Sequence, residues 1–139
     1  MFHKKTLASI ILAAAVLAPA ASFAAPAEEA PCILRSHQIT SVAPYRVQQH
    51  TGRGVTTRLA GAQVFVRAEP GLTPEWLELQ LARHISEMQG PAGMKNCALG
   101  VKDVRVKVDS AGTGFAVKLI ARDSAQAEEV LRRAQLLAR

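Results

Sequence analysis

The sequence is poor in the residues and motifs that most often carry chemistry. Aromatic residues make up only 4% of the 139 residues, and there are two cysteines and one tryptophan. No CxxC or HxxxH spacing, no dense methionine run and no GxSxG setting for a serine nucleophile is present. Aspartate occurs at only three positions, and no spacing indicates a pair of catalytic carboxylates. We therefore expect a protein that is not an enzyme.

Internal repeats are also absent, which excludes solenoids and propellers. Hydrophobic residues make up 49% of the chain and charged residues 20%. This balance is typical of a globular domain rather than of a disordered or collagenous chain. After the N-terminal segment, no stretch is apolar and long enough to cross a membrane, so we expect no membrane span.

The N-terminus has the three parts of a signal peptide. Lys4 and Lys5 are positively charged, Leu7–Leu17 is small and apolar, and Ser22–Ala24 places small residues before a cleavage site. We expect residues 1–24 to be cleaved off near Ala24 and the mature protein to be periplasmic or secreted. An uncleaved anchor or a buried N-terminal helix is the alternative.

The mature chain is mildly basic. Removal of the two lysines leaves 15 basic and 11 acidic residues, so the formal net charge falls from +6 to +4. Export argues against nucleic acid as a partner and leaves an acidic protein or an anionic envelope surface. Arg46, His50, Arg53 and Arg58 mark one basic hairpin as the candidate anion or partner contact. An ordinary solvated hairpin tip is the alternative interpretation.

The two cysteines, Cys32 and Cys97, predict a disulfide, because an even and small number of cysteines in an exported protein is usually paired. The bridge would close a loop of about 65 residues and contribute roughly 4 kcal/mol to stability in the chain-entropy model. It would also tether the segment 25–40, which we expect to be flexible.

Hydropathy patterns predict four strands and two helices. Alternating residues indicate strands within 41–68, with a turn at 51–54 and a bulge or bend at 60–62, and a second hairpin over 104–119. Between the hairpins, Thr73 and Pro74 begin a helix with an apolar stripe, which Gly90 and Pro91 end.

The second helix begins after Asp123. Asp123 is an N-cap, and Gln126 would complete a capping box. Favourable pairs four residues apart are expected on its outer face, namely Glu128–Arg132 and Glu129–Arg133.

The element order β-β-α-β-β-α predicts an α+β fold. We expect a two-layer sandwich, with a mainly antiparallel sheet and both helices on one face, in a single domain over residues 41–139. The stretch from Gln63 to Leu137 resembles a ferredoxin-like arrangement without its last strand. This resemblance is architectural and implies no function.

A weaker pattern concerns metal. His84 and Met88 lie four residues apart on the first helix, and Met94 and His37 would approach them if the disulfide forms. Imidazole and thioether groups are suitable ligands for Cu(I). The alternative is that the methionines fill the core and the histidines lie at the surface.

Together these patterns predict a small exported, non-enzymatic binding or accessory module of the cell envelope, without a cofactor. Its expected partner is another envelope protein, contacted through a sheet edge or a hairpin. A copper-handling protein is the alternative function, and contact with an anionic envelope surface is a third.

Overall fold

The structure, a computed structural model, describes residues 31–88 and 94–139. The expected signal peptide, its cleavage site and the expected helix end at Gly90 and Pro91 lie outside these residues. None of the helices in the described part is long and apolar enough to span a membrane.

Four strands and two helices follow the predicted order. They are β1 (Ile39–Thr51), β2 (Gly54–Arg67), α1 (Pro74–Met88), β3 (Arg105–Ala111), β4 (Gly114–Ile120) and α2 (Ser124–Gln135). Three short 3-10 turns accompany them, η1 (Ile33–Ser36), η2 (Ala98–Gly100) and η3 (Leu136–Ala138).

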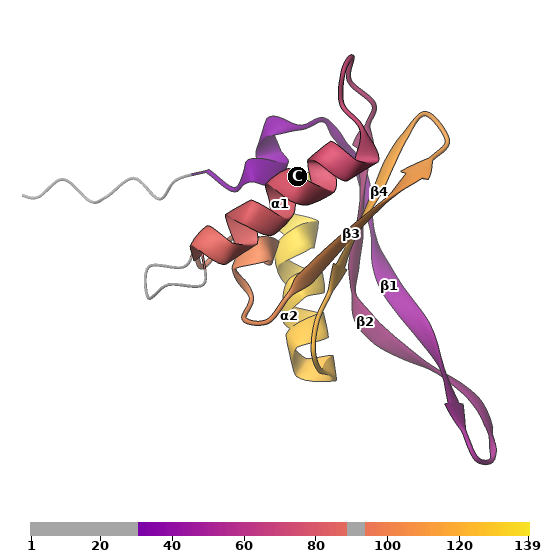
Figure 1. Ribbon diagram of the computed structural model, residues 1–139. Coiled ribbons are helices and arrows are strands. Elements are labelled where there is room, and N and C mark those ends of the chain that lie inside the picture. Colours follow the sequence, from indigo (N-terminus) through magenta and orange to yellow (C-terminus); the bar gives the residue numbers. More distant parts are fainter. Residues whose placement is uncertain (1–30, 89–93) are drawn as a thin grey trace, which may run out of the picture.

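The strands form one sheet in the order β1-β2-β4-β3, and each neighbouring pair is antiparallel. β2 and β3 therefore run parallel on either side of β4, and α1 connects them, as in a split β-α-β unit. Both helices lie on the same side of the sheet (Figure 1), where α1 packs against β3 and α2 against β2. The predicted two-layer α+β sandwich is confirmed, and β1 adds a strand on the free side of β2.

The core lies between the helices and the covered face of the sheet. The stripe predicted for α1 is buried as a whole: Leu77, Leu81, Ile85 and Met88. Alternate residues of β2 and β4 supply the facing layer: Ala62, Val64, Val66, Phe115, Val117 and Leu119. The period of two along each strand thus places one set of side chains in the core and leaves the other set on an open face.

Local signals set the starts of both helices. The Thr73 hydroxyl accepts a hydrogen bond from the Trp76 backbone N–H at 3.2 Å, and the Asp123 carboxylate accepts one from the Gln126 N–H at 2.9 Å. The capping box predicted for the second helix is wrong, because the Gln126 side-chain oxygen is buried and has no hydrogen-bond partner in the described part of the chain. Of the two hydrogen bonds of a capping box, only the one accepted by the Asp123 carboxylate is formed.

The expected pair between Glu128 and Arg132 is also not formed. Arg132 bonds instead to Glu129, at 2.8 and 2.7 Å, and Glu129 also bonds Arg133 as expected. One carboxylate therefore binds both arginines. The reason is tertiary, because Arg133 is 17% exposed and is held against the loop that carries Cys97.

A bulge in β2 confirms the irregularity expected at 60–62. Tyr45 lies opposite Gly61, whereas Arg46 lies opposite Leu59, so Ala60 is the extra residue. Gly61 has a φ of 149°, and a Cβ at this position would collide with the Leu119 carbonyl of β4. Glycine is therefore required by close approach of backbone and by a conformation that other residues rarely adopt.

The bulge is also where the sheet narrows. β4 pairs with β2 only from Gly61 to Arg67, so the first half of β2 pairs with β1 alone. We call residues 46–58 of this two-stranded ribbon the arm. The arm extends well beyond the sandwich (Figure 1).

The predicted disulfide between Cys32 and Cys97 is present, with a Cα–Cα distance of 5.3 Å. It fastens η1 to the loop that precedes β3. Leu34 of η1 is fully buried in the core, and β1 begins at Ile39. The described part of the segment expected to be flexible is therefore packed on the domain.

The two edges of the sheet differ. At β3, the Glu78 carboxylate of α1 accepts a hydrogen bond from the Val108 backbone N–H at 2.8 Å, and it lies 3.8 Å from the Lys107 ammonium. A helix side chain thus occupies a group that an edge strand would otherwise offer to another chain. At the opposite edge, β1 continues into the arm.

Candidate functional site

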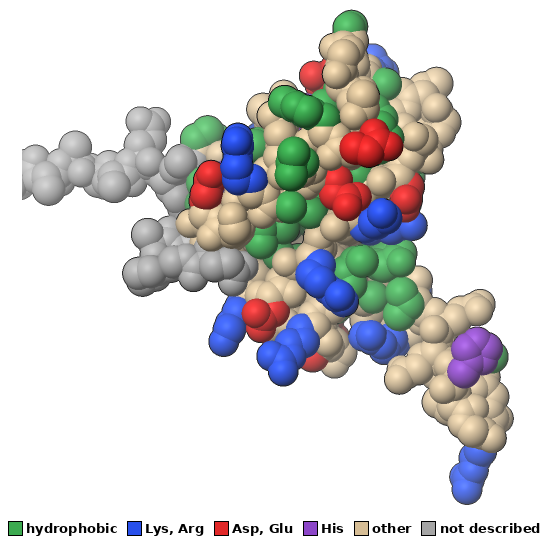
Figure 2. All heavy atoms as spheres, in the orientation of Figure 1, with side chains coloured by type: hydrophobic (Ala, Val, Ile, Leu, Met, Phe, Trp, Pro, Cys, Tyr) green, Lys and Arg blue, Asp and Glu red, His purple; other side chains and the backbone are tan. Residues whose placement is uncertain are grey.

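The four residues of the predicted partner contact all lie on the arm. Arg46 and Arg58 lie at its base, His50 lies near its end and Arg53 lies in the turn. Every residue from Gln48 to Arg58 is exposed. Figure 2 shows the arm as a projection that carries basic and histidine side chains, with no acidic side chain in this view.

The strand register divides these residues between the two faces of the ribbon. Arg58 lies opposite Val47, so both point to one face, whereas Arg46 and His50 point to the other. The four side chains are therefore distributed over the two faces and the turn of the arm, and they do not form one compact cluster.

The arm is positive because it lacks compensating acids. The chain contains no aspartate or glutamate from residue 30 to residue 68, a stretch that includes all of β1 and β2. Neither Arg46 nor Arg53 has an ion pair with any residue of the described part.

The four candidate metal ligands lie in different surroundings. Met88 is buried in the core, and Met94 is partly buried and packs against the core. His84 is partly buried beside Cys32. His37 faces Glu69 instead, with its Nδ1 atom 3.5 Å from the carboxylate.

Across residues 31–88 and 94–139, no group of three or more histidine, cysteine, aspartate or glutamate side chains could hold a metal ion. The Nε2 atom of His84 is buried without a hydrogen-bond partner within the described part. The copper alternative stays a prediction.

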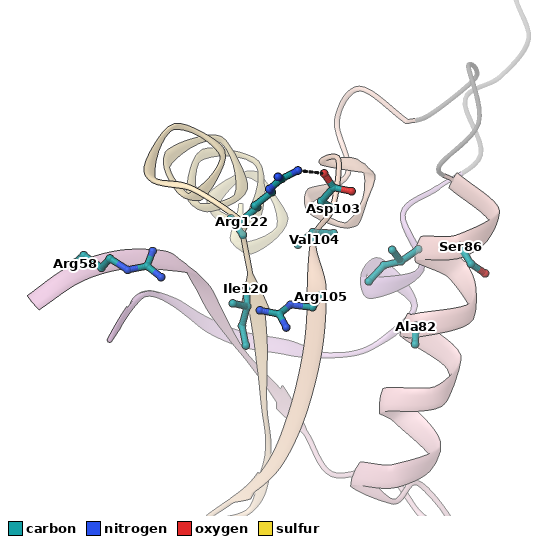
Figure 3. A pocket seen from close by; sticks show the side chains of 10 residues that line it. Arg58, Ala82, Ser86, Asp103, Val104, Arg105, Ile120 and Arg122 are labelled. Atoms are coloured by element: carbon teal, nitrogen blue, oxygen red, sulfur yellow. Dashed lines mark ion pairs between the residues drawn. The ribbon is translucent and has the colours of Figure 1, made fainter. Parts of the chain in front are cut away.

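A second basic site was not predicted from the sequence. A depression of about 640 Å³ lies at the end of the sheet where β3 begins and β4 ends. Three arginines line it, Arg58, Arg105 and Arg122, and we call it the arginine pocket. In Figure 3 the side chains of Arg58 and Arg105 both point toward Ile120.

The register explains how the arginine pocket forms. Arg105 of β3 lies opposite Ile120 of β4, and Ile120 lies opposite Gly61 of β2, three residues after Arg58. The bulge at Ala60 turns Arg58 to the open face of the sheet, and Arg105 shares that face with its partner Ile120. Nothing in the sequence links Arg105 to Arg58, because the two residues lie in different hairpins.

One acidic residue also lines the arginine pocket. The Asp103 carboxylate lies 3.5 Å from the Arg122 guanidinium (Figure 3). Asp103 has a φ of 57°, a left-handed conformation that aspartate tolerates better than most residues. The side chains of Arg58 and Arg105 have no ion pair or hydrogen-bond partner among the described residues.

Farther along the open face, Lys118 makes a compact polar contact. Its ammonium lies 2.8 Å from the Asp109 carboxylate and 5.5 Å from the centre of the Tyr45 ring. The hydrogen bond to Lys118 lowers the pKa of Asp109, and the same bond raises the pKa of Lys118. This lysine is therefore compensated, unlike Arg58 and Arg105 in the arginine pocket.

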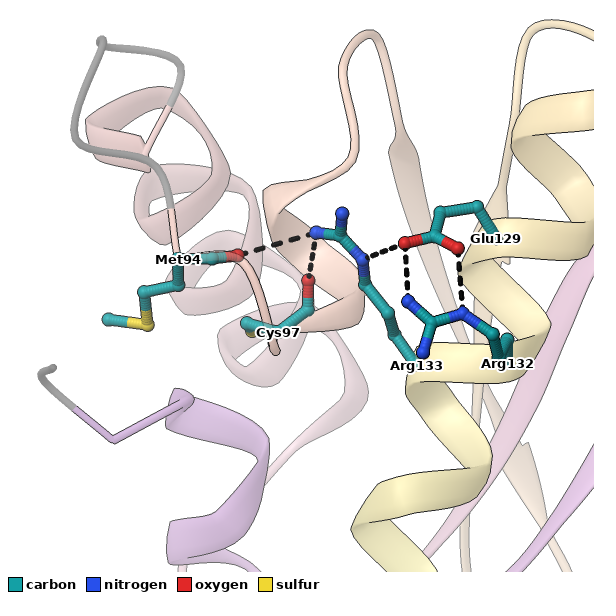
Figure 4. Close-up of polar contacts among 5 residues, drawn as sticks. All are labelled: Met94, Cys97, Glu129, Arg132 and Arg133. Atoms are coloured by element: carbon teal, nitrogen blue, oxygen red, sulfur yellow. Dashed lines mark hydrogen bonds and ion pairs between the residues drawn. The ribbon is translucent and has the colours of Figure 1, made fainter.

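A charged cluster on α2 connects this helix to the loop that carries Cys97. Arg133 of α2 donates hydrogen bonds to the backbone carbonyls of Met94 and Cys97, each at 3.3 Å, and also binds Glu129 (Figure 4). Hydrogen bonds from Arg132 and Arg133 lower the pKa of Glu129 to about 2. This cluster holds the end of α2 against the disulfide loop.

Comparison with known proteins gives no relative from which a function could be transferred: no family model, curated protein or solved structure matches the chain.

Proposed function

We propose that the protein is a small exported, non-enzymatic binding module of the cell envelope, and that the arm is its contact surface. The observation that carries this proposal is the extension of the β1–β2 ribbon beyond the sandwich, where its residues are exposed. An isolated two-stranded ribbon is only marginally stable in water. Binding of a partner would bury the exposed side chains of this ribbon and would stabilise its two strands.

The charge of the arm favours an acidic segment of a partner protein. Arg46, Arg53 and Arg58 give it three positive charges, and no acid lies on either strand. Such a surface attracts an acidic partner over several ångströms and accelerates encounter, and added salt weakens both effects. The ribbon also offers backbone groups of β1 at an open edge, where an extended segment could pair.

Export rests on two supports. The predicted signal peptide would direct the chain out of the cytoplasm. The Cys32–Cys97 bridge is of the kind that forms and persists in an oxidising compartment.

The test is site-specific photo-crosslinking in the cells that produce the protein. A crosslinker at Gln48 on the arm should capture a protein partner, whereas one at the exposed Glu128 on α2 should not. The double variant Arg46→Glu/Arg53→Glu should abolish the crosslink from Gln48. Arg35→Glu/Arg67→Glu is the matched control, because it makes the same charge change at exposed positions outside the arm.

Equal crosslinking from Gln48 and Glu128, or a crosslink from Gln48 that survives charge reversal, would contradict the proposal. Capture of lipid in place of protein would replace the protein partner with an anionic envelope surface.

A further inference from the structure

We infer that the arginine pocket binds a phosphate group carried on a small apolar body. This site goes beyond the proposed contact through the arm. Arg58 belongs to both surfaces, but Arg105 and Arg122 lie in the sandwich.

The first argument is charge. Arg58 and Arg105 point toward the same residue, Ile120, and neither meets a carboxylate in the described part of the chain. Both side chains are exposed and unpaired among the described residues, so both guanidinium groups are available to a bound anion. Phosphate fits better than carboxylate, because it carries up to two charges and has three terminal oxygens to share between the two guanidinium groups.

The second argument is the apolar lining. Buried or partly buried aliphatic side chains complete the wall: Ile85, Val104, Ile120 and Ala121. They would cover the organic part of a phosphate ester and leave its charged end near the arginines. A site with a mainly apolar wall and few placed polar groups is typical of small-molecule recognition.

The third argument is the acid at the rim. Asp103 is the one acidic residue in the lining, and its ion pair with Arg122 occupies the third guanidinium. Asp103 therefore acts as an internal competitor of the ligand. Its removal should release Arg122 and strengthen phosphate binding. Asn is the suitable replacement, since it also tolerates the left-handed backbone found here.

Phenyl phosphate is the probe, titrated into the purified mature protein and followed by calorimetry. The wild type should bind it, and Arg105→Gln should weaken binding about tenfold, as expected for loss of a charged hydrogen bond. Asp103→Asn should tighten binding several-fold. The control is Arg67→Gln, which makes the same charge change on an exposed arginine of β2, about 20 Å from Gly61.

Two further probes identify the source and the chemistry of the phosphate. Cosedimentation with phosphatidylcholine vesicles that contain phosphatidic acid, lost in Arg105→Gln, would assign a lipid headgroup. Binding of phenyl phosphate without vesicle binding would assign a soluble ester. Benzoate should bind more weakly than phenyl phosphate.

The inference is overturned if neither phenyl phosphate nor the vesicles bind, if benzoate binds equally well, or if Arg67→Gln weakens binding as much as Arg105→Gln. These outcomes are separate from those of the crosslinking test, because neither Arg105 nor Asp103 lies on the arm.

Discussion

Replacing Arg133 with methionine should destabilise the fold by about 3 kcal/mol. The side chain is 17% exposed, and its guanidinium joins α2 to the carbonyls of Met94 and Cys97. Methionine keeps the apolar stem but leaves both carbonyls without this donor. Each bond to a carbonyl is long, at 3.3 Å, so we assign about 1 kcal/mol to each, below the roughly 1.5–3 kcal/mol of typical bonds to a charged group. The contact with Glu129 adds about 1 kcal/mol.

A matched substitution distinguishes the loss of the contacts that Arg133 makes with the loop from the loss of a surface charge. Arg132→Met removes an arginine that is 59% exposed and whose side chain, among the described residues, bonds only Glu129. Exposed ion pairs contribute little, so the loss should stay below about 1 kcal/mol. The double variant Glu129→Gln/Arg133→Met should show a coupling of about 1 kcal/mol, because the two side chains are in direct contact.

The difference in the free energy of unfolding between wild type and Arg133→Met should also depend on pH. The pKa of Glu129 is lowered to about 2 by Arg132 and Arg133, from a usual value of 4.5. The stabilisation from its ionised form is therefore fully present above pH 4.5 and is lost as the pH falls through about 2. In Arg133→Met the pKa of Glu129 should rise, so the gap between variant and wild type should narrow in acid.

Urea unfolding followed by far-ultraviolet circular dichroism is the suitable assay. Tryptophan fluorescence would be a poor probe, because Trp76 is already 51% exposed in the folded state. Equal urea midpoints for wild type and Arg133→Met would refute this role of Arg133. So would an equally large loss of unfolding free energy in Arg132→Met.

Three further outcomes follow from the fold. Reduction of the disulfide should lower the free energy of unfolding by about 4 kcal/mol, seen as an earlier urea midpoint with dithiothreitol; an unchanged midpoint would contradict this. Gly61→Ala should cost more than about 2 kcal/mol in thermal unfolding, because its Cβ would collide with the Leu119 carbonyl, whereas Gly52→Ala, with open space around it, should be nearly neutral. Glu78→Ala should free the Val108 N–H at the β3 edge and increase self-association in analytical ultracentrifugation; a monomer at all concentrations would count against edge protection.

The sequence alone determined much of the local structure. Thr73 and Asp123 set the helix starts because their side chains bond to backbone N–H groups three residues away, which requires no distant partner. Alternation predicted both hairpins, and the weak strand residues at 60–62 predicted the bulge. Cysteine number together with the predicted export was enough to pair Cys32 with Cys97.

Tertiary structure decided the features that depend on distant neighbours. Glu129 binds two arginines because the loop at Cys97 holds Arg133 in place. The arm projects because β4, with 7 residues, is half as long as β2, with 14, a mismatch that matters only once the two strands pair.

The candidate sites divide in the same way. The basic residues of the arm could be found from the sequence, because they lie within one hairpin. The arginine pocket could not, because Arg58 and Arg105 are brought together only by the register of β2, β4 and β3. Register is fixed by burial of the opposite face of the sheet, and a shift of one residue would turn these side chains away from the pocket.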